Sequence, residues 1–167
     1  PHLFPEREGL DIHASMTTAK EVGGDLYGYL LEGDLIYVCV GDVSGKGVPA
    51  SLFMAQATRL FRTLAAQCMM PAEIITRMNA ALTEDNEQGM FVTMFLGVVN
   101  LKTGHLDFCN AGHNPPVLLD RFESDGKKSA QFLEMESNAP IGLWPGLDFV
   151  GEEIDSIKGR PLVIYSD

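Results

Sequence analysis

Apolar residues follow two different spacings along this chain of 167 residues, and the change of spacing divides it into strands and helices. Short apolar runs separated by Gly- and Asp-containing turns are typical of paired strands, whereas two longer segments repeat their apolar residues at helical spacing. Hairpins, then two helices, then hairpins again, without strict βαβ alternation, predict an α+β domain built on layered antiparallel sheets. The predicted strands are 11–16, 26–31, 35–41, 91–101, 105–110, 117–120, 131–134, 147–154 and 162–165, and the predicted helices are 48–67 and 71–82.

An aspartate stands at the end of one of the most apolar predicted strands. The run 35–40 predicts a buried strand, Asp42 follows it, and a glycine-rich turn over 45–47 leads into the first predicted helix. A carboxylate in this position is held by rigid scaffold yet faces the rim, where binding sites are commonly built. The rest of the chain can be interpreted as support or partner for Asp42.

The hairpin before Asp42 brings a second aspartate to the same end. If Leu31 pairs with Leu35, Asp25 lies opposite Gly41, and Asp25 and Asp42 become diagonal neighbours about 7–8 Å apart at Cα. Two carboxylates so placed repel each other unless a proton or a cation intervenes. The alternative is that each aspartate caps its own turn, a common use of this residue, and the spacing alone favours neither interpretation.

A third aspartate, Asp167, follows the last predicted strand, 162–165. Carboxylates at strand ends are hard oxygen ligands of the kind that suits Mg²⁺ or Mn²⁺. On spacing alone, a purely structural cation and no cation at all remain alternatives.

Composition limits the class of protein. The hydrophobic content of 46% is sufficient for one domain with a real core, so we expect residues 1–167 to form a single domain. The net charge of −11 argues against non-specific nucleic-acid binding, which needs clustered Lys and Arg. Three cysteines without CxxC spacing indicate a reducing compartment. No run reaches the roughly 18 apolar residues of a membrane-spanning helix, and the first residues do not resemble a signal peptide. We therefore expect a cytoplasmic protein. A piece of a membrane-attached protein would look the same.

Other catalytic motifs fit poorly. Residues 45–50 match GxGxx(G/A), but the acidic residue expected about twenty positions later is absent, since the next acid is Glu73, and the P-loop pattern fails as well. His113 is expected to be a turn residue that hydrogen-bonds the backbone rather than a ligand or a general acid, and the scattered histidines do not indicate a zinc site. Ser44 and Ser51 have no evident base partner, which argues against a nucleophilic serine.

Five motifs, taken together, resemble those of the RsbU/SpoIIE-type serine phosphatases, the bacterial branch of the metal-dependent protein phosphatases (protein phosphatase 2C fold). They occur in the order of that family and cover nearly the whole chain. The matching segments are 19–25 (AKEVGGD), 41–50 (GDVSGKGVPA), 89–93 (GMFVT), 110–116 (NAGHNPP) and 165–167 (YSD).

This resemblance implies a layered α-β-β-α sandwich, with two antiparallel sheets flanked by helix pairs and a two-metal centre at one edge. It implies that Asp42 bridges two Mn²⁺ or Mg²⁺ ions, that Val43 offers its backbone carbonyl, and that Asp25 and Asp167 complete the ligand set. Asp25 and Asp42 would be the catalytic residues. The implied reaction is hydrolysis of phosphoserine by metal-activated water, without a phospho-enzyme.

Two departures from the family pattern affect these expectations. Gly28 stands where this branch often has a second aspartate, and we expect this difference to tune the site rather than abolish it. The chain stops at Asp167, whereas the family continues to a late aspartate motif that supplies another ligand. We therefore expect a domain truncated at its C-terminal end that lacks part of one metal site.

The resemblance also implies partners. The substrate would be a phosphorylated regulatory protein, such as an anti-sigma-factor antagonist, and a sensor domain in the same full-length protein would control activity. A homodimer is compatible with this arrangement, whereas nucleic acid and direct membrane insertion are not expected. Two other functions stay open: a degenerate phosphatase that binds phosphoproteins without turnover, and a hydrolase of small phosphoesters.

Overall fold

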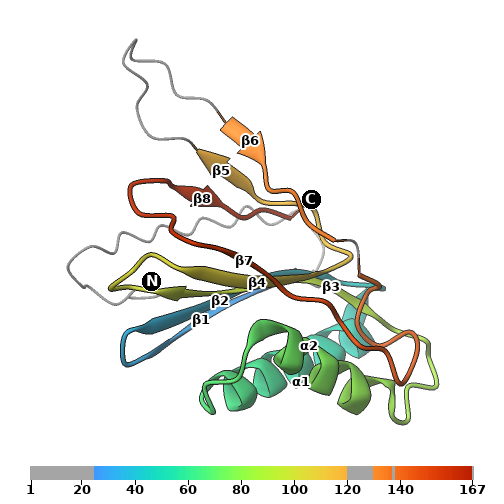
Figure 1. The fold of residues 1–167 in the computed structure, drawn as a ribbon. Coiled ribbons are helices and arrows are strands. Elements are labelled where there is room, and N and C mark those ends of the chain that lie inside the picture. Colours follow the sequence, from blue (N-terminus) through green and yellow to red (C-terminus); the bar gives the residue numbers. More distant parts are fainter. Residues whose placement is uncertain (1–24, 120–129, 137, 167) are drawn as a thin grey trace.

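Two antiparallel sheets and a pair of helices are stacked in three layers in the computed structural model, which describes residues 25–119, 130–136 and 138–166 (Figure 1). The three-stranded sheet lies uppermost in Figure 1, the five-stranded sheet lies in the middle and the helices lie below it. The α+β sandwich predicted from the sequence is therefore confirmed.

The central sheet has the strand order β1-β2-β3-β4-β7, and all its pairs are antiparallel. Two of its three interior strands, β2 and β3, correspond to the most apolar runs of the sequence. The strands are β1 (Asp25–Glu32), β2 (Leu35–Val43), β3 (Val92–Asn100), β4 (Leu106–Ala111) and β7 (Glu152–Ile154).

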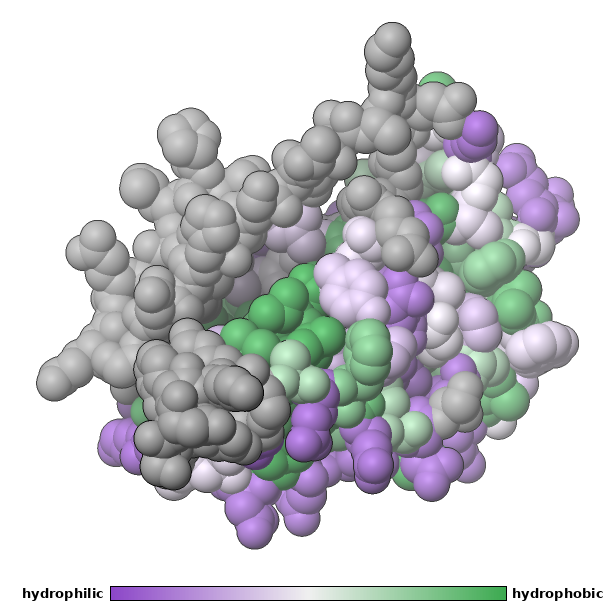
Figure 2. Space-filling model, turned by 90° about the horizontal axis from the view of Figure 1, so that it is seen from above, coloured by the Kyte–Doolittle hydropathy of each residue, from purple (hydrophilic) through white to green (hydrophobic). Residues whose placement is uncertain are grey.

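The smaller sheet has the order β6-β5-β8 and consists of β5 (Val117–Leu119), β6 (Ala130–Phe132) and β8 (Leu162–Val163). Its inner face packs on the central sheet through a core that includes Phe95 and Phe108, whose rings stack with centroids 5.8 Å apart. Its outer face carries apolar side chains: Val117 is the cross-strand partner of both Phe132 and Val163, which are 64% and 45% exposed. Figure 2, seen from this side of the molecule, shows hydrophobic side chains at the surface.

The helices are α1 (Gly47–Ala65) and α2 (Pro71–Thr83), and they cover the other face of the central sheet (Figure 1). Their buried residues recur every three or four positions, so each helix presents one apolar stripe to the sheet. Pro71 occupies the first turn of α2, where its missing N–H leaves no hydrogen bond unmade. Neither described helix is long and apolar enough to cross a membrane.

Three sequence predictions differ in detail from the structure. The strand predicted over 147–154 pairs only at Glu152–Ile154, because the N–H groups of Phe149 and Val150 donate to the side chains of Thr76 and Asn138 instead of a neighbouring strand. A second helix pair, implied by the resemblance, is not present among the described residues. The strand predicted over 11–16 lies outside them.

The predicted register of the first hairpin was wrong by one residue. Glu32 pairs with Leu35, which leaves a two-residue turn of Gly33 and Asp34. Gly33 has φ +58°, as at the first central position of a type II′ turn, whose twist matches that of the flanking strands. The shift places Asp25 directly opposite Asp42 rather than opposite Gly41.

The pairing of β2 with β3 is unusually close beside Asp42. A Cβ atom added to Gly41 would lie 2.5 Å from the backbone oxygen of Thr93, a separation that forces the two strands apart. At Gly28, on the neighbouring strand, an added Cβ atom would meet the Phe61 ring at 3.3 Å, and this side chain can move. The glycine at position 41 is therefore required by packing.

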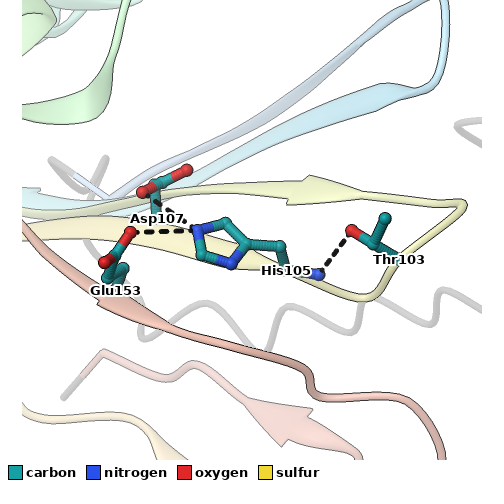
Figure 3. A network of polar contacts seen from close by, with 4 residues as sticks. All are labelled: Thr103, His105, Asp107 and Glu153. Carbon is teal, nitrogen blue, oxygen red and sulfur yellow. Dashed lines mark hydrogen bonds and ion pairs between the residues drawn. The ribbon is translucent and has the colours of Figure 1, made fainter.

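A polar cluster lies at the opposite end of the central sheet (Figure 3). The Nε2 atom of His105 is 3.4 Å from Oδ1 of Asp107 and 3.2 Å from Oε2 of Glu153, and the His105 N–H donates to the hydroxyl of Thr103. Desolvation lowers the pKa of His105, but the two carboxylates outweigh it, so that the net pKa is raised. The cluster is a surface ion-pair network.

We expect Gly41→Ala to lower the free energy of unfolding by about 1–3 kcal/mol, because the new methyl group overpacks the β2–β3 contact. Gly28→Ala is the matched control, with a smaller effect because only a side-chain ring must move. Urea unfolding of the two variants measures both. Equal stability of Gly41→Ala and the unchanged protein would contradict the close approach.

We expect the His105 cluster to stabilise the fold in a pH-dependent way. Because the pKa of His105 is raised in the folded state, its contribution is fully present below pH 6.5, the unperturbed value, and is lost as the pH rises through the raised pKa. The difference in unfolding free energy between the unchanged protein and His105→Gln, measured between about pH 5 and 8, should therefore shrink with increasing pH. A difference that grows with pH would show that the sign is wrong.

Candidate metal centre

The candidate centre is built on the end of the β1–β2 hairpin. Asp42 is exposed at the rim of the central sheet, and Asp25 is its cross-strand partner. Directly opposed residues of an antiparallel pair have Cα atoms about 4.5–5.5 Å apart, closer than the diagonal placement that the sequence predicted. Val43 ends β2 with its side chain buried. Asp167 lies outside the described residues.

Backbone alternation determines where the peptide groups around Asp42 point. The N–H and C=O of Val92 both bond to Ile141, away from β2, so Val43 and Val92 form a non-hydrogen-bonded pair. The alternation then makes Asp42 and Thr93 a hydrogen-bonded pair and turns the carbonyl of Val43 toward the β1 side. The Val43 carbonyl, which the resemblance assigns as a ligand, therefore points from β2 toward β1, the strand that begins with Asp25.

The loop after Asp42 is fixed by Ser44. Its N–H donates to the Phe91 carbonyl over 2.8 Å, and its hydroxyl oxygen accepts from the Phe91 N–H over 2.9 Å. The hydroxyl of Ser51 donates to the Gly47 carbonyl. Both serines therefore serve the backbone, which supports the prediction that neither is a nucleophile.

A series of polar contacts connects Asp42 with Tyr165. The Thr93 hydroxyl lies 3.4 Å from the Asp42 carbonyl oxygen and 3.2 Å from Nδ1 of His113. The other ring nitrogen, Nε2, lies 2.7 Å from the carbonyl oxygen of Tyr165. The prediction that His113 is a turn residue bonded to the backbone is confirmed.

The side chain of Asn110 holds the turn that carries His113. Its amide oxygen accepts from the His113 N–H over 3.0 Å, and its NH₂ group donates to the His113 carbonyl over 2.7 Å. Sequence reasoning assigned no role to Thr93 or Asn110. Their only signal was their presence in the motifs 89–93 and 110–116.

The cysteines contribute little to this chemistry. Burial raises the pKa of both Cys39 and Cys109 to about 12, so these thiols stay protonated and are poor metal ligands or nucleophiles. Cys68 is exposed in the turn after α1. The ligands that the resemblance implies, carboxylates and a backbone carbonyl, are all oxygen donors, which fit Mg²⁺ or Mn²⁺ better than a softer metal.

The cluster around His105 is a separate feature. Three ligand-type atoms of His105, Asp107 and Glu153 lie within 4.8 Å of one another. However, the partner of Asp107 on β3 is Val98, five residues from Thr93, or about 17 Å along the strand. This cluster therefore cannot share an ion with Asp42.

Comparisons with known proteins identify relatives of this chain. The chain is 27% identical over 164 residues to the phosphoserine phosphatase RsbU of Bacillus subtilis (strain 168), and the match covers 98% of this chain and 47% of RsbU. The chain thus spans about half the length of this relative.

Solved structures share the fold. The RsbU and RsbW domains of Rv1364c from Mycobacterium tuberculosis superpose with a TM-score of 0.73 at 28% identity, covering 92% of this chain and 40% of that one. RsbX in complex with magnesium gives a TM-score of 0.62 at 18% identity, covering 82% of this chain and 62% of that one, a likeness of fold alone. A model of the family described as stage II sporulation protein E (SpoIIE) matches residues 32–167. Because this match includes most of the chain, the chain belongs to the SpoIIE family.

Proposed function

We propose that this chain is the catalytic part of a metal-dependent phosphoserine protein phosphatase. The observation that carries the proposal is the register that sets Asp25 directly opposite Asp42 at an exposed sheet rim. Aspartates placed on neighbouring strand ends are a common source of oxygen ligands for Mg²⁺ or Mn²⁺. RsbU, which resembles nearly the whole chain, is named as a phosphoserine phosphatase.

In this proposal Asp25, Asp42, the Val43 carbonyl and Asp167 hold two divalent cations, Mn²⁺ or Mg²⁺. The fit rests on the all-oxygen donor set and on the direction of the Val43 carbonyl. Bound in pairs, such cations supply an activated water and neutralise charge on a phosphoryl group. Asp42 would hold the ions from a strand end that cannot move without breaking the β2–β3 pairing. RsbX, of the same fold, was crystallised with magnesium.

The exposed position of Asp42 suits a protein substrate, because a phosphoserine on another protein can approach a rim but not a deep cavity. We infer that the substrate is a phosphorylated regulatory protein of the anti-sigma-factor antagonist type, that a sensor domain of the full-length protein controls the reaction, and that the reaction takes place in the cytoplasm. The occurrence of RsbU and RsbW domains together in Rv1364c supports a regulatory setting of this kind. The residues 1–167 would form one domain of that protein.

We expect Mn²⁺-dependent phosphate release from a phosphoserine protein by the full-length protein, and a loss of about 100-fold or more in Asp42→Asn, because one carboxylate oxygen needed for the ions is replaced by an amide. Asp107→Asn is the matched control, since it removes a strand carboxylate remote from the rim. Faster hydrolysis of a phosphopeptide than of an aryl phosphate would separate a protein phosphatase from an enzyme of small phosphoesters.

Two results would contradict the proposal. Metal binding without turnover in the full-length protein would indicate a degenerate phosphatase that only binds phosphoproteins. Full activity in Asp42→Asn would show that the chemistry lies elsewhere.

A further inference from the structure

One buried histidine connects the two sheets near the candidate centre. His113 is 7% exposed and lies in the turn after β4 of the central sheet. Its ring contacts Thr93 of β3 on one side and the carbonyl of Tyr165, beyond β8 of the smaller sheet, on the other. Thr93 is in turn the cross-strand partner of Asp42.

The partners of the ring assign its protons. The Tyr165 oxygen is a carbonyl and can only accept, so Nε2 carries the proton and donates to it. In the neutral ring, Nδ1 then accepts from the Thr93 hydroxyl. Both nitrogens are occupied in holding protein groups, which leaves neither for metal binding or for proton transfer to a substrate.

The backbone of His113 is also fixed by hydrogen bonds. The Asn110 amide bonds both the N–H and the C=O of His113, and the Asn138 side chain donates to the Asn110 carbonyl over 3.0 Å. Asn110 and His113 are two of the three buried polar residues in the part of the chain that the structure describes. Burying polar groups is unfavourable unless every one is bonded, as these are, so this turn is a rigid support.

The topology explains why such a support matters. Asp42 belongs to the central sheet, whereas the segment that leads to Asp167 extends from β8, which pairs only with β5 in the smaller sheet. No strand ladder joins the two sheets among the described residues. Apart from the connecting segments such as 112–116, their relative position at this rim depends on side-chain contacts, and the His113 ring provides a direct one.

We propose that His113 is a positioning residue that fixes the Tyr165–Ser166 segment, which Asp167 follows in the sequence, relative to Asp42. The inference rests on the proposed function, in which the two aspartates hold the same pair of cations. Residues that orient metal ligands without touching the metal typically change affinity by about 10- to 100-fold when they are replaced. His113 acts through Thr93 and Tyr165 and does not itself take part in the reaction.

The first experiment compares three substitutions of His113 in the full-length protein by titration with Mn²⁺ alone. Glutamine can place an amide N–H near the position of Nε2 and keep the bond to Tyr165, whereas asparagine reaches only the Thr93 side. We expect Mn²⁺ affinity to fall about 10- to 100-fold in His113→Ala and His113→Asn and to be restored in part in His113→Gln, which keeps the bond to Tyr165 but loses the contact with Thr93. Equal affinity in His113→Asn and the unchanged protein would overturn the inference, and so would equal losses in His113→Asn and His113→Gln.

Thr93 offers a second, nearly isosteric pair in case His113 variants fold poorly. Thr93→Val removes the hydroxyl that bonds Nδ1 and keeps the side-chain shape, whereas Thr93→Ser keeps the hydroxyl. We expect weaker Mn²⁺ binding in Thr93→Val only. The same affinity in both variants would overturn the role of the ring contact.

A metal-free measurement separates this inference from the proposed function. Amide hydrogen exchange of residues 162–166 should be faster in His113→Asn than in His113→Gln, because only the former releases the Tyr165 carbonyl. An unchanged exchange rate of residues 162–166 in His113→Asn would show that the ring does not connect the two sheets, independently of Mn²⁺ binding. If the unchanged protein neither binds Mn²⁺ nor releases phosphate, the phosphatase proposal fails. If the unchanged protein does both and the His113 variants match it in every measurement, the positioning role fails and the phosphatase proposal stands.

Discussion

The close pairing of β2 with β3 is the constraint on which the rest of the structure depends. Gly41 lets the two backbones approach beside Asp42, and the register of this pairing sets Asp42 opposite Thr93 and Val43 opposite Val92. Because β1 adds to β2 through a two-residue turn, the same strand end also receives Asp25. A side chain at position 41 would force β2 away from β3 and move all these groups at once, which explains the glycine there.

The helix layer is connected to the same strand end through hydrogen bonds. Asn79 of α2 accepts from the N–H of Gly142, and Asn86 donates to the Gly142 carbonyl while bonding both backbone groups of Met90. The next residue, Phe91, bonds Ser44 in the loop after Asp42. Asn79 is 1% exposed and Asn86 is only partly covered, so the bonds nearest the helix are the best protected from water. A displacement of α2 must therefore break these bonds or carry the loop with it.

The sequence predicted the elements well and their exact pairing less well. Apolar spacing located both helices and the strands of the central sheet, because these segments bury continuous apolar faces. The register of the first hairpin depended on whether the turn held two or three residues, and a single glycine with positive φ decided it. The predicted strand 147–154 pairs only at its end, because the side chains of Thr76 and Asn138, which lie outside this run, bind the backbone at Phe149 and Val150. Local patterns carry no information about such distant acceptors.

The same limit explains why the sequence predicted the aspartates of the candidate site but not the residues that support them. Aspartates at strand ends can be recognised one at a time, since each directly precedes or follows a predicted strand. The support around them cannot, because Thr93, His113 and Tyr165 come from three segments that no spacing relates. The motifs that carry the family resemblance acquire a physical meaning only when folded: 41–50 provides the strand end and its loop, 89–93 the partner strand, and 110–116 the rigid turn that reaches Tyr165. Each motif is weakly informative alone because each supplies one side of a contact whose other side lies in another motif.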